Sequence, residues 1–153
     1  MTSTGAPVAT FTIHDPAIAI NVATLANGNW VLAYWQGAVN GGDIRFQIHT
    51  PTGGTASNTI VVASGTDSHT YPDIVALPDG GFVILWHNAT ADMLLARRFS
   101  STGASDGTVF EVATGVTGEP DIGMTGDRQA VAALFGMLDS FSPRFDIVTP
   151  AAQ

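Results

Sequence analysis

The sequence predicts an all-β protein made of three four-stranded antiparallel repeats in a β-propeller-like arrangement. A turn followed by an apolar strand occurs at residues 77–86 and, 52 positions earlier, at residues 25–34. A degenerate copy follows at residues 125–134. Several strand-like runs recur in each period of about 50 residues, which is typical of β repeat folds.

The first repeat is expected over about residues 20–63. Asn27 and Gly28 both tolerate positive φ, so they predict a two-residue hairpin ahead of an apolar strand. Glycine-rich segments separate the later strand-like runs of this repeat. Its four strands are expected at residues 21–25, 30–35, 43–49 and 59–63.

The second repeat, about residues 72–113, and the third, about residues 120–150, follow the same order. In the second repeat we expect strands at residues 73–77, 82–86, 93–99 and 108–113. The third repeat opens on Glu119-Pro-Asp-Ile, which matches Tyr71-Pro-Asp-Ile. It continues with expected strands at 130–135 and 144–150 and lacks a fourth strand.

A candidate for the missing strand lies at the other end of the chain. Residues 8–14 are rich in β-branched side chains, and Thr10-Phe-Thr-Ile resembles the fourth strands of the complete repeats. Residues 1–153 are therefore expected to form a single β-repeat domain, with the N-terminal strand completing the last blade. Such closure removes an unpaired sheet edge that would otherwise favour aggregation.

A β-trefoil is the alternative, because three repeats of about 50 residues also fit that fold. The strands at 30–35 and 82–86 are apolar at every position rather than at alternate ones. This pattern favours a propeller, whose inner strands are covered on both faces. Three blades are too few to close a ring, so the propeller interpretation predicts self-association that completes it.

The composition excludes several kinds of partner and site. The net charge is −8, and the five basic residues are all Arg, which argues against nucleic acid as a partner. No apolar run is long enough to insert into a membrane, and the absence of Cys excludes disulfides. The N-terminus shows no signal peptide.

The second repeat carries a recognisable pattern. A proline-led strand reaches Pro78-Asp-Gly-Gly81, an apolar strand ends in Trp86, and Arg97-Arg-Phe is followed by Gly103. This pattern resembles the repeats of large secreted bacterial repeats-in-toxin and adhesin-like proteins. The resemblance implies a propeller-like adhesion or ligand-binding module that is extracellular or associated with the cell surface.

Aromatic residues near the loops are the first candidates for a binding site. Trp30, Tyr34, Phe82 and Trp86 match one another between copies, so we expect them in the core. Trp35 is matched instead with His87 and Phe135, at strand ends where loops begin. Variable residues at a repeated loop edge suit a ligand site between blades. The candidate ligand-binding residues are Trp35, His87, Phe135, Asp43 and Asp92.

Acidic residues are the second group. Asp43, Asp92 and Asp139 each precede an Arg-Phe strand, and pairing with Arg45, Arg98 and Arg144 is expected to compete with a ligand role. Asn27, Asp79 and Asp127 occupy equivalent turns, where local turn hydrogen bonds are favoured over calcium binding. No cofactor is expected, although calcium stays open.

No catalytic motif is visible among the Ser, His and carboxylate residues, so we expect a non-catalytic protein. The leading hypothesis is an extracellular binding or adhesion module for carbohydrate, with a glycan or cell-surface ligand as partner. The alternative is a structural, self-assembling surface or virion-decorating subunit.

Overall fold

The computed structural model describes residues 17–38, 41–116, 118–124, 131–135 and 144–148, and every regular element in these ranges is a strand. The strands are β1 (Ala17–Thr24), β2 (Trp30–Ala38), β3 (Gly41–His49), β4 (Ile60–Ala63), β5 (His69–Ala76), β6 (Phe82–Asn88), β7 (Met93–Phe99), β8 (Ser105–Thr114), β9 (Pro120–Met124), β10 (Val131–Phe135) and β11 (Arg144–Val148). The expected all-β class is confirmed, and the strand expected at 8–14 lies outside the described residues.

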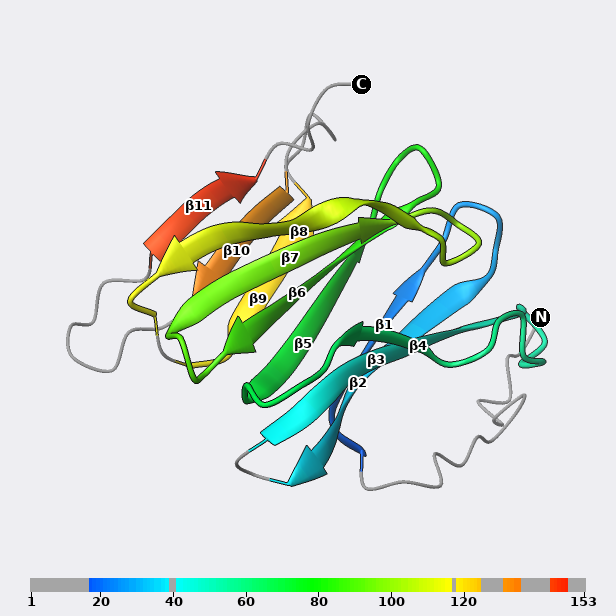
Figure 1. Ribbon diagram of the computed structural model, residues 1–153. Coiled ribbons are helices and arrows are strands. Elements are labelled where there is room, and N and C mark those ends of the chain that lie inside the picture. Colours follow the sequence, from blue (N-terminus) through cyan, green and yellow to red (C-terminus); the bar gives the residue numbers. More distant parts are fainter. Residues whose placement is uncertain (1–16, 39–40, 117, 125–130, 136–143, 149–153) are drawn as a thin grey trace, which may run out of the picture.

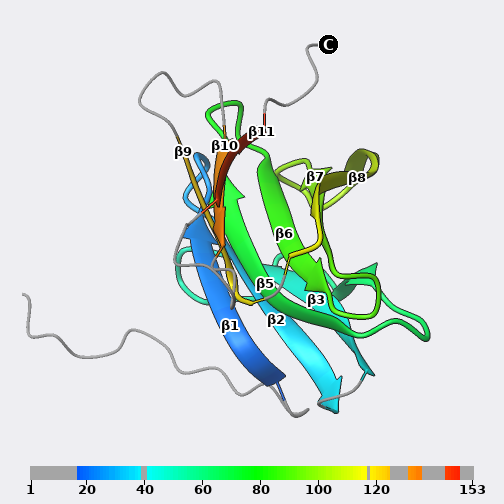
Figure 2. The same cartoon turned by 90° about the vertical axis from the view of Figure 1, so that its left-hand side faces the viewer.

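The strands form three antiparallel sheets (Figure 1). The first sheet has the order β1-β2-β3-β4, the second β5-β6-β7-β8, and the third β9-β10-β11, so neighbours in sequence are neighbours in space. Strand β1 contacts β5, and β5 contacts β9 (Figure 2). The opening strands of successive sheets therefore lie next to one another.

Four hairpin turns share one geometry that differs from the predicted two-residue hairpin. The N–H of Leu25 donates to the carbonyl of Asn29 at 2.7 Å, and the N–H of Leu77 donates to that of Gly81 at 2.8 Å. These bonds leave three residues in each loop. The third is a glycine in the left-handed region, Gly28 at φ 85° and Gly80 at φ 92°. The turns at 50–54 and 100–104 have the same bond, from the N–H of Thr50 to the carbonyl of Gly54 and from the N–H of Ser100 to that of Ala104.

A β-bulge recurs near the start of the first strand in two sheets. Register shifts occur between Ile18 and Ile20 in β1 and between Thr70 and Asp73 in β5. The bulge residues Ala19 and Tyr71, 52 positions apart, have φ of 51° and 50°. The matched bulges show that the first two sheets are built alike, beyond their shared turn sequences.

The second strand of the second sheet is buried along its whole length, as its uninterrupted apolar pattern predicted. Phe82, Ile84 and Trp86 pack in one cluster with side chains of the first sheet. Val83 and Leu85 pack in a second cluster with Ile122 of β9. The second sheet is therefore covered on both faces.

Three phenylalanines form the centre of the contact between the first two sheets. The ring of Phe46 from β3 lies edge-on to Phe82 at 5.2 Å and to Phe99 at 4.8 Å between centroids. Phe82 and Phe99 stack at 5.4 Å. All three are among the largest fully buried side chains. Edge-to-face pairs of this kind add to the stabilisation from buried area.

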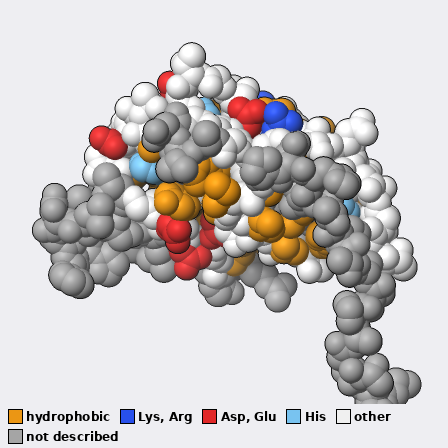
Figure 3. Space-filling model, turned by 90° about the horizontal axis from the view of Figure 1, so that it is seen from below, with side chains coloured by type: hydrophobic (Ala, Val, Ile, Leu, Met, Phe, Trp, Pro, Cys, Tyr) orange, Lys and Arg blue, Asp and Glu red, His pale blue; other side chains and the backbone are white. Residues whose placement is uncertain are grey.

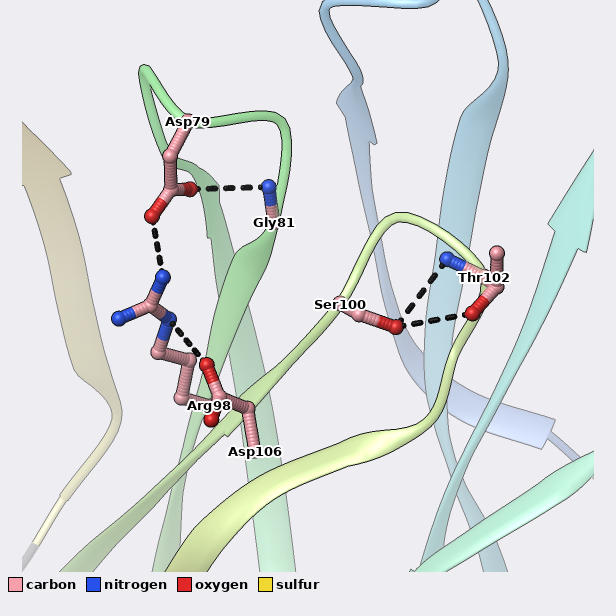
Figure 4. Close-up of polar contacts among 6 residues, drawn as sticks. All are labelled: Asp79, Gly81, Arg98, Ser100, Thr102 and Asp106. Carbon is pink, nitrogen blue, oxygen red and sulfur yellow. Dashed lines mark hydrogen bonds and ion pairs between the residues drawn. The ribbon is translucent and has the colours of Figure 1, made fainter. Parts of the chain in front are cut away.

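Arg98 ties a turn to the rim strand of the second sheet (Figure 4). Its guanidinium group forms ion pairs with Asp79 and with Asp106, whose Oδ2 lies 3.1 Å from Nε. The expected pairing of Arg98 with Asp92 is wrong. Asp79 and Asp106 reach Arg98 because β7 pairs with β6 and β8 along its length, whereas Asp92 lies before β7 begins.

Candidate ligand-binding edge

Trp35 and His87 are both buried, although they were expected at an open loop edge. Trp35 is 4 % exposed and belongs to the core between the first two sheets. His87 is 6 % exposed, and its Nε2 lies 3.0 Å from the carbonyl of Val116. The reason is that β2 and β6 continue past these residues, to Ala38 and Asn88. Neither side chain offers a free surface for stacking against a ligand.

The position of Phe135 differs by one residue from the predicted alignment. Leu134 pairs with Asp121 in the third sheet as Leu85 pairs with Asp73 in the second. Phe135 is therefore equivalent to Trp86 and not to His87. The strand register therefore contradicts the predicted match of Phe135 with Trp35 and His87.

The two acidic candidates lie in different settings. Asp43 accepts a hydrogen bond from Nη2 of Arg45 at 2.7 Å, which confirms their predicted pairing. Asp92 is exposed, has φ of 51°, and its carbonyl accepts the N–H of Val116 at 3.2 Å. Asp139 lies outside the described residues. Of the two described acids, only Asp43 lies at the junction between the first and second sheets.

A backbone contact joins the first two sheets at the end where β3 begins. Gly42 forms a parallel bridge with Ser68, just before β5. The Trp35 indole lies against Gly42 so closely that a Cβ at Gly42 would be 2.0 Å from Nε1. The Nε1 of Trp35 is buried and finds no acceptor in the described part of the chain. The bridge and the indole fix where the polar residues on either side can lie.

Polar side chains from both sheets gather around this bridge. Nδ2 of Asn88 donates to Oδ2 of Asp67 at 3.0 Å. Burial lowers the pKa of His69, and the charges of Asp67 and Asp43 oppose that shift because both carboxylates lie near the imidazole. With Arg45 on Asp43, the edge presents carboxylate and guanidinium groups, and the buried amide of Asn88 and imidazole of His69 lie beneath them.

Tyr71 supplies an aromatic surface at the same edge. Its ring meets that of Trp35 edge-on, with 5.8 Å between centroids, and Tyr71 is partly exposed. Its positive φ comes from the bulge in β5. The bulge therefore places an accessible tyrosine on top of the buried tryptophan. We name the group formed by Asp43, Arg45, Asp67, His69, Tyr71 and Asn88 the bridge edge.

The sequence reasoning found Asp43 and missed most of the bridge edge. Asp67, His69 and Tyr71 lie between the expected repeats at residues 20–63 and 72–113, where a connecting segment is predicted. In the structure β5 begins at His69. The available signal was the match of Tyr71-Pro-Asp-Ile with Glu119-Pro-Asp-Ile, which extends the repeat to residue 71.

The turn residues that were weighed for calcium use their side chains locally. Oδ1 of Asn27 accepts the N–H of Asn29 at 3.0 Å, and Oδ1 of Asp79 accepts that of Gly81 at 3.0 Å (Figure 4). These bonds are the turn chemistry that the sequence favoured. Within the described ranges, no group of three or more His, Asp or Glu is arranged to hold a metal ion.

A hollow elsewhere on the surface has simpler chemistry than the bridge edge. It is open and shallow and is lined by Thr55, Ala56, Ser57, Asn58, Ile60 and Thr102. No charged or aromatic side chain lines it. The bridge edge therefore offers the richer set of groups for recognising a ligand.

Comparison with known proteins yielded no match to a protein-family model and no match to a curated protein. In the described part of the chain there is no helix long and apolar enough to span a membrane.

Proposed function

We propose that this protein is a non-catalytic binding module that holds a carbohydrate at the bridge edge. The observation that carries the proposal is the convergence of Asp43, Arg45 and Asp67 beside the partly exposed ring of Tyr71, with the buried Asn88 holding Asp67 in place. Sugar hydroxyls need carboxylate and amide acceptors together with cationic or amide donors. An aromatic ring complements the apolar face of a pyranose.

The electrostatics of the edge agree with a neutral, polyhydroxylated ligand. Arg45 already pairs with Asp43, and Asp67 receives a hydrogen bond from Asn88, so the charges are partly compensated before a ligand arrives. A net charge of −8 disfavours acidic ligands over the whole surface. We infer from the resemblance to adhesin-like repeats that the module works outside the cell or on its surface.

The sheet arrangement supports a propeller-like form of the module. The opening strands of the three sheets follow one another in contact, and the second sheet packs between the other two. Blades around a common axis have this order. In such a form, ligands bind at the edges where neighbouring blades meet, and the bridge edge is a junction of that kind.

A glycan array followed by isothermal titration calorimetry tests the function. We expect the wild-type chain to bind at least one glycan class. Tyr71→Ala is expected to weaken binding about 10- to 100-fold through the lost ring contact, whereas Tyr71→Phe keeps the ring and most of the affinity. Asp43→Asn is expected to weaken binding about 10-fold because one charged acceptor is lost.

Glu111→Gln is the matched control for charge, since Glu111 is exposed on β8 and belongs to the rim of the second sheet. It changes the net charge by the same amount as Asp43→Asn and should leave the affinity unchanged. An equal loss in both variants, or a wild-type chain that binds no glycan, contradicts the proposal.

A structural, self-assembling role is the second candidate. It is favoured by one separate observation, the apolar side chains that β1 leaves exposed. Native mass distinguishes the roles: a glycan-binding module is a small closed oligomer, whereas an assembly protein reaches large or lattice-like masses.

A further inference from the structure

The first sheet has an outer face that turns away from the second sheet. Val31, Ala33 and Trp35 of β2 belong to the core between the sheets, so the alternate residues Leu32 and Tyr34 lie on the opposite face. Cross-strand pairing places Val22 beside Leu32 and Ile20 beside Tyr34 on that face. The outer face is thus apolar on both β1 and β2. Leu32 and Tyr34 are already buried, at 8 % and 7 % exposed, so the accessible apolar surface lies on β1.

The second sheet shows what normally covers such a face. Its positions equivalent to Ile20 and Val22, 52 residues later, are Pro72 and Ile74. Pro72 is less than 2 % exposed and Ile74 is 7 % exposed, because the first sheet packs on them. Ile20 is 50 % exposed and Val22 is 57 % exposed. Hydrophobic side chains reach the surface in the view of the molecule from below (Figure 3). Within the described chain, the outer face of the first sheet therefore lacks the sheet that its counterpart has.

A polar contact accompanies each packed pair of sheets. Nδ2 of Asn21 in β1 donates to the carbonyl of Pro72 in β5 at 2.7 Å. One sheet later, Oδ2 of Asp73 accepts the N–H of Ile122 in β9 at 2.7 Å. Asn21 and Asp73 hold the same position in their strands, since each is paired with the second strand at an equivalent residue, Ala33 or Leu85.

Asp121 of β9 holds this position in the third sheet, where it pairs with Leu134. It is exposed, and its carboxyl lies near that of Asp73 in β5, so it would turn away from this like-charged neighbour to reach a strand of another copy. The third sheet thus presents the same inter-sheet group as the first two. In the two observed contacts this group bonds to the first strand of the next sheet, which is β5 or β9. Strand β1 is the first strand of the remaining sheet, so it is the strand that Asp121 would be expected to meet.

We propose that the outer face of the first sheet binds the third sheet of a second copy of this chain. Ile20 and Val22 pack under that sheet as Pro72 and Ile74 pack under the first sheet. The Asp121 carboxylate of the second copy accepts the backbone N–H of Val22, because Val22 is the counterpart of Ile122. The contact is heterologous, so two chains joined by two such contacts close a six-sheet ring, and chains that do not close form filaments.

Both halves of this contact belong to one chain, which is why a second copy fits better than an unrelated partner. An open apolar face alone would suit many partners. The matched position of Asp121 selects a strand with the geometry of β1. Because each chain carries a net charge of −8, salt is expected to strengthen the association by screening the repulsion between copies.

Sedimentation equilibrium of the full chain between micromolar and millimolar concentration tests the proposal. The wild type is expected to show twice the 15.8 kDa chain mass, with tighter association at higher salt. Val22→Asp and Ile20→Asp place a charge in the contact and are each expected to raise the dissociation constant about 100-fold or more. Val109→Asp is the control, because Val109 is 41 % exposed on the rim strand β8.

Asp121 is tested by a pair of variants in the same experiment. Asp121→Ala removes the acceptor and is expected to raise the dissociation constant about 10-fold. Asp121→Asn keeps a side-chain oxygen and can also use the amide as Asn21 does, so its affinity should stay within about threefold of the wild type. Circular dichroism melts confirm that each variant is folded.

The outcomes separate clearly. If the wild type forms filaments and Val22→Asp does not, the outer face of the first sheet is the contact and the chains do not close into a ring. A wild-type monomer over the whole concentration range overturns the proposal. So does a dimer that Val22→Asp and Ile20→Asp leave intact while both variants remain folded.

Discussion

The carboxylate of Asp73 in β5 accepts the backbone N–H of Ile122 in β9 across the gap between two sheets, at 2.7 Å. Its second oxygen accepts the N–H of Ile74 at 2.8 Å. Burial raises the pKa of Asp73, the two N–H donors oppose that shift, and the nearby carboxyl of Asp121 adds to it. Asn21 makes the corresponding inter-sheet contact with an uncharged amide. Both asparagine and aspartate therefore serve at this position.

We expect Asp73→Asn to change the free energy of unfolding more favourably at neutral pH than in acid. A folded pKa above the unfolded value means that Asp73 contributes stability below the unfolded pKa and loses it as pH rises through the folded pKa. Asparagine removes this loss. The difference in unfolding free energy between variant and wild type should grow as pH rises from about 3 to 7, measured by urea denaturation.

Asp73→Ala is the comparison for that experiment. It removes both acceptors and is expected to be about 1–2 kcal/mol less stable than Asp73→Asn at every pH. If Asp73→Asn were as destabilised as Asp73→Ala at pH 7, the charge on Asp73 would be needed for the inter-sheet bond, contrary to the example of Asn21.

Gly42→Ala is expected to destabilise the protein by about 1–3 kcal/mol. The added Cβ would lie 2.0 Å from Nε1 of Trp35 and 2.8 Å from the carbonyl oxygen of Gln36. Either the buried indole or the strand backbone must move. Gly123→Ala in β9 is the matched control, since nothing lies within 4 Å of its added Cβ. Chemical denaturation should separate the two variants; equal stabilities would mean that Trp35 moves freely.

Much of the fold could be predicted because the repeats carry strong local signals. The apolar runs at 30–35 and 82–86 became β2 and β6, and the burial of β6 on both faces agrees with its sequence pattern. The number of loop residues was harder to predict. Asn27-Gly28 alone fits a two-residue turn, and the choice of a three-residue loop depends on the pairing of Leu25 with Asn29 across the hairpin.

The candidate site was predicted less well, for reasons of register. A bulge adds one residue to a strand and reverses the faces beyond it, and neither Ala19 nor Tyr71 has a sequence that marks a bulge. The third repeat has lost its glycines and aromatics, so its alignment slipped by one residue and misplaced Phe135. Trp35 is expected at a loop edge because its matched residues, His87 and Phe135, vary in type at the predicted strand ends, although β2 continues to Ala38.

Gly103→Ala is expected to cost more stability than Gly80→Ala. Both glycines close three-residue turns in the left-handed region, at φ 87° and 92°, so both substitutions carry the same backbone strain of about 1 kcal/mol. Only the Cβ at Gly103 would meet core side chains, with Ile60 Cδ1 at 2.8 Å and Ile48 Cδ1 at 3.3 Å. Nothing lies within 4 Å at Gly80.

Thermal and urea unfolding of both glycine variants measure this difference, which we expect to be about 1–2 kcal/mol. It isolates the docking of the 100–104 turn onto the first sheet from the strain of the turn itself. Equal losses would show that this turn does not press on the core in solution.

We expect the protein to lose stability as pH falls from about 7 to 5. Burial lowers the pKa of both His49 and His69, with Asp67 and Asp43 partly opposing the shift at His69. A histidine with a lowered folded pKa contributes stability above its unfolded pKa of about 6.5 and loses it as pH falls through the folded value. The unfolded chain then binds protons that the folded chain does not.

Two-dimensional NMR titration of the imidazole resonances measures both histidines directly. We expect both to titrate below pH 6.5, the unperturbed value. In Asp67→Asn, one of the charges that favour the protonated form of His69 is removed, so the pKa of His69 should fall further while that of His49 stays unchanged. A rise at His69, or an equal change at His49, would mean that Asp67 does not act on the bridge edge through its charge.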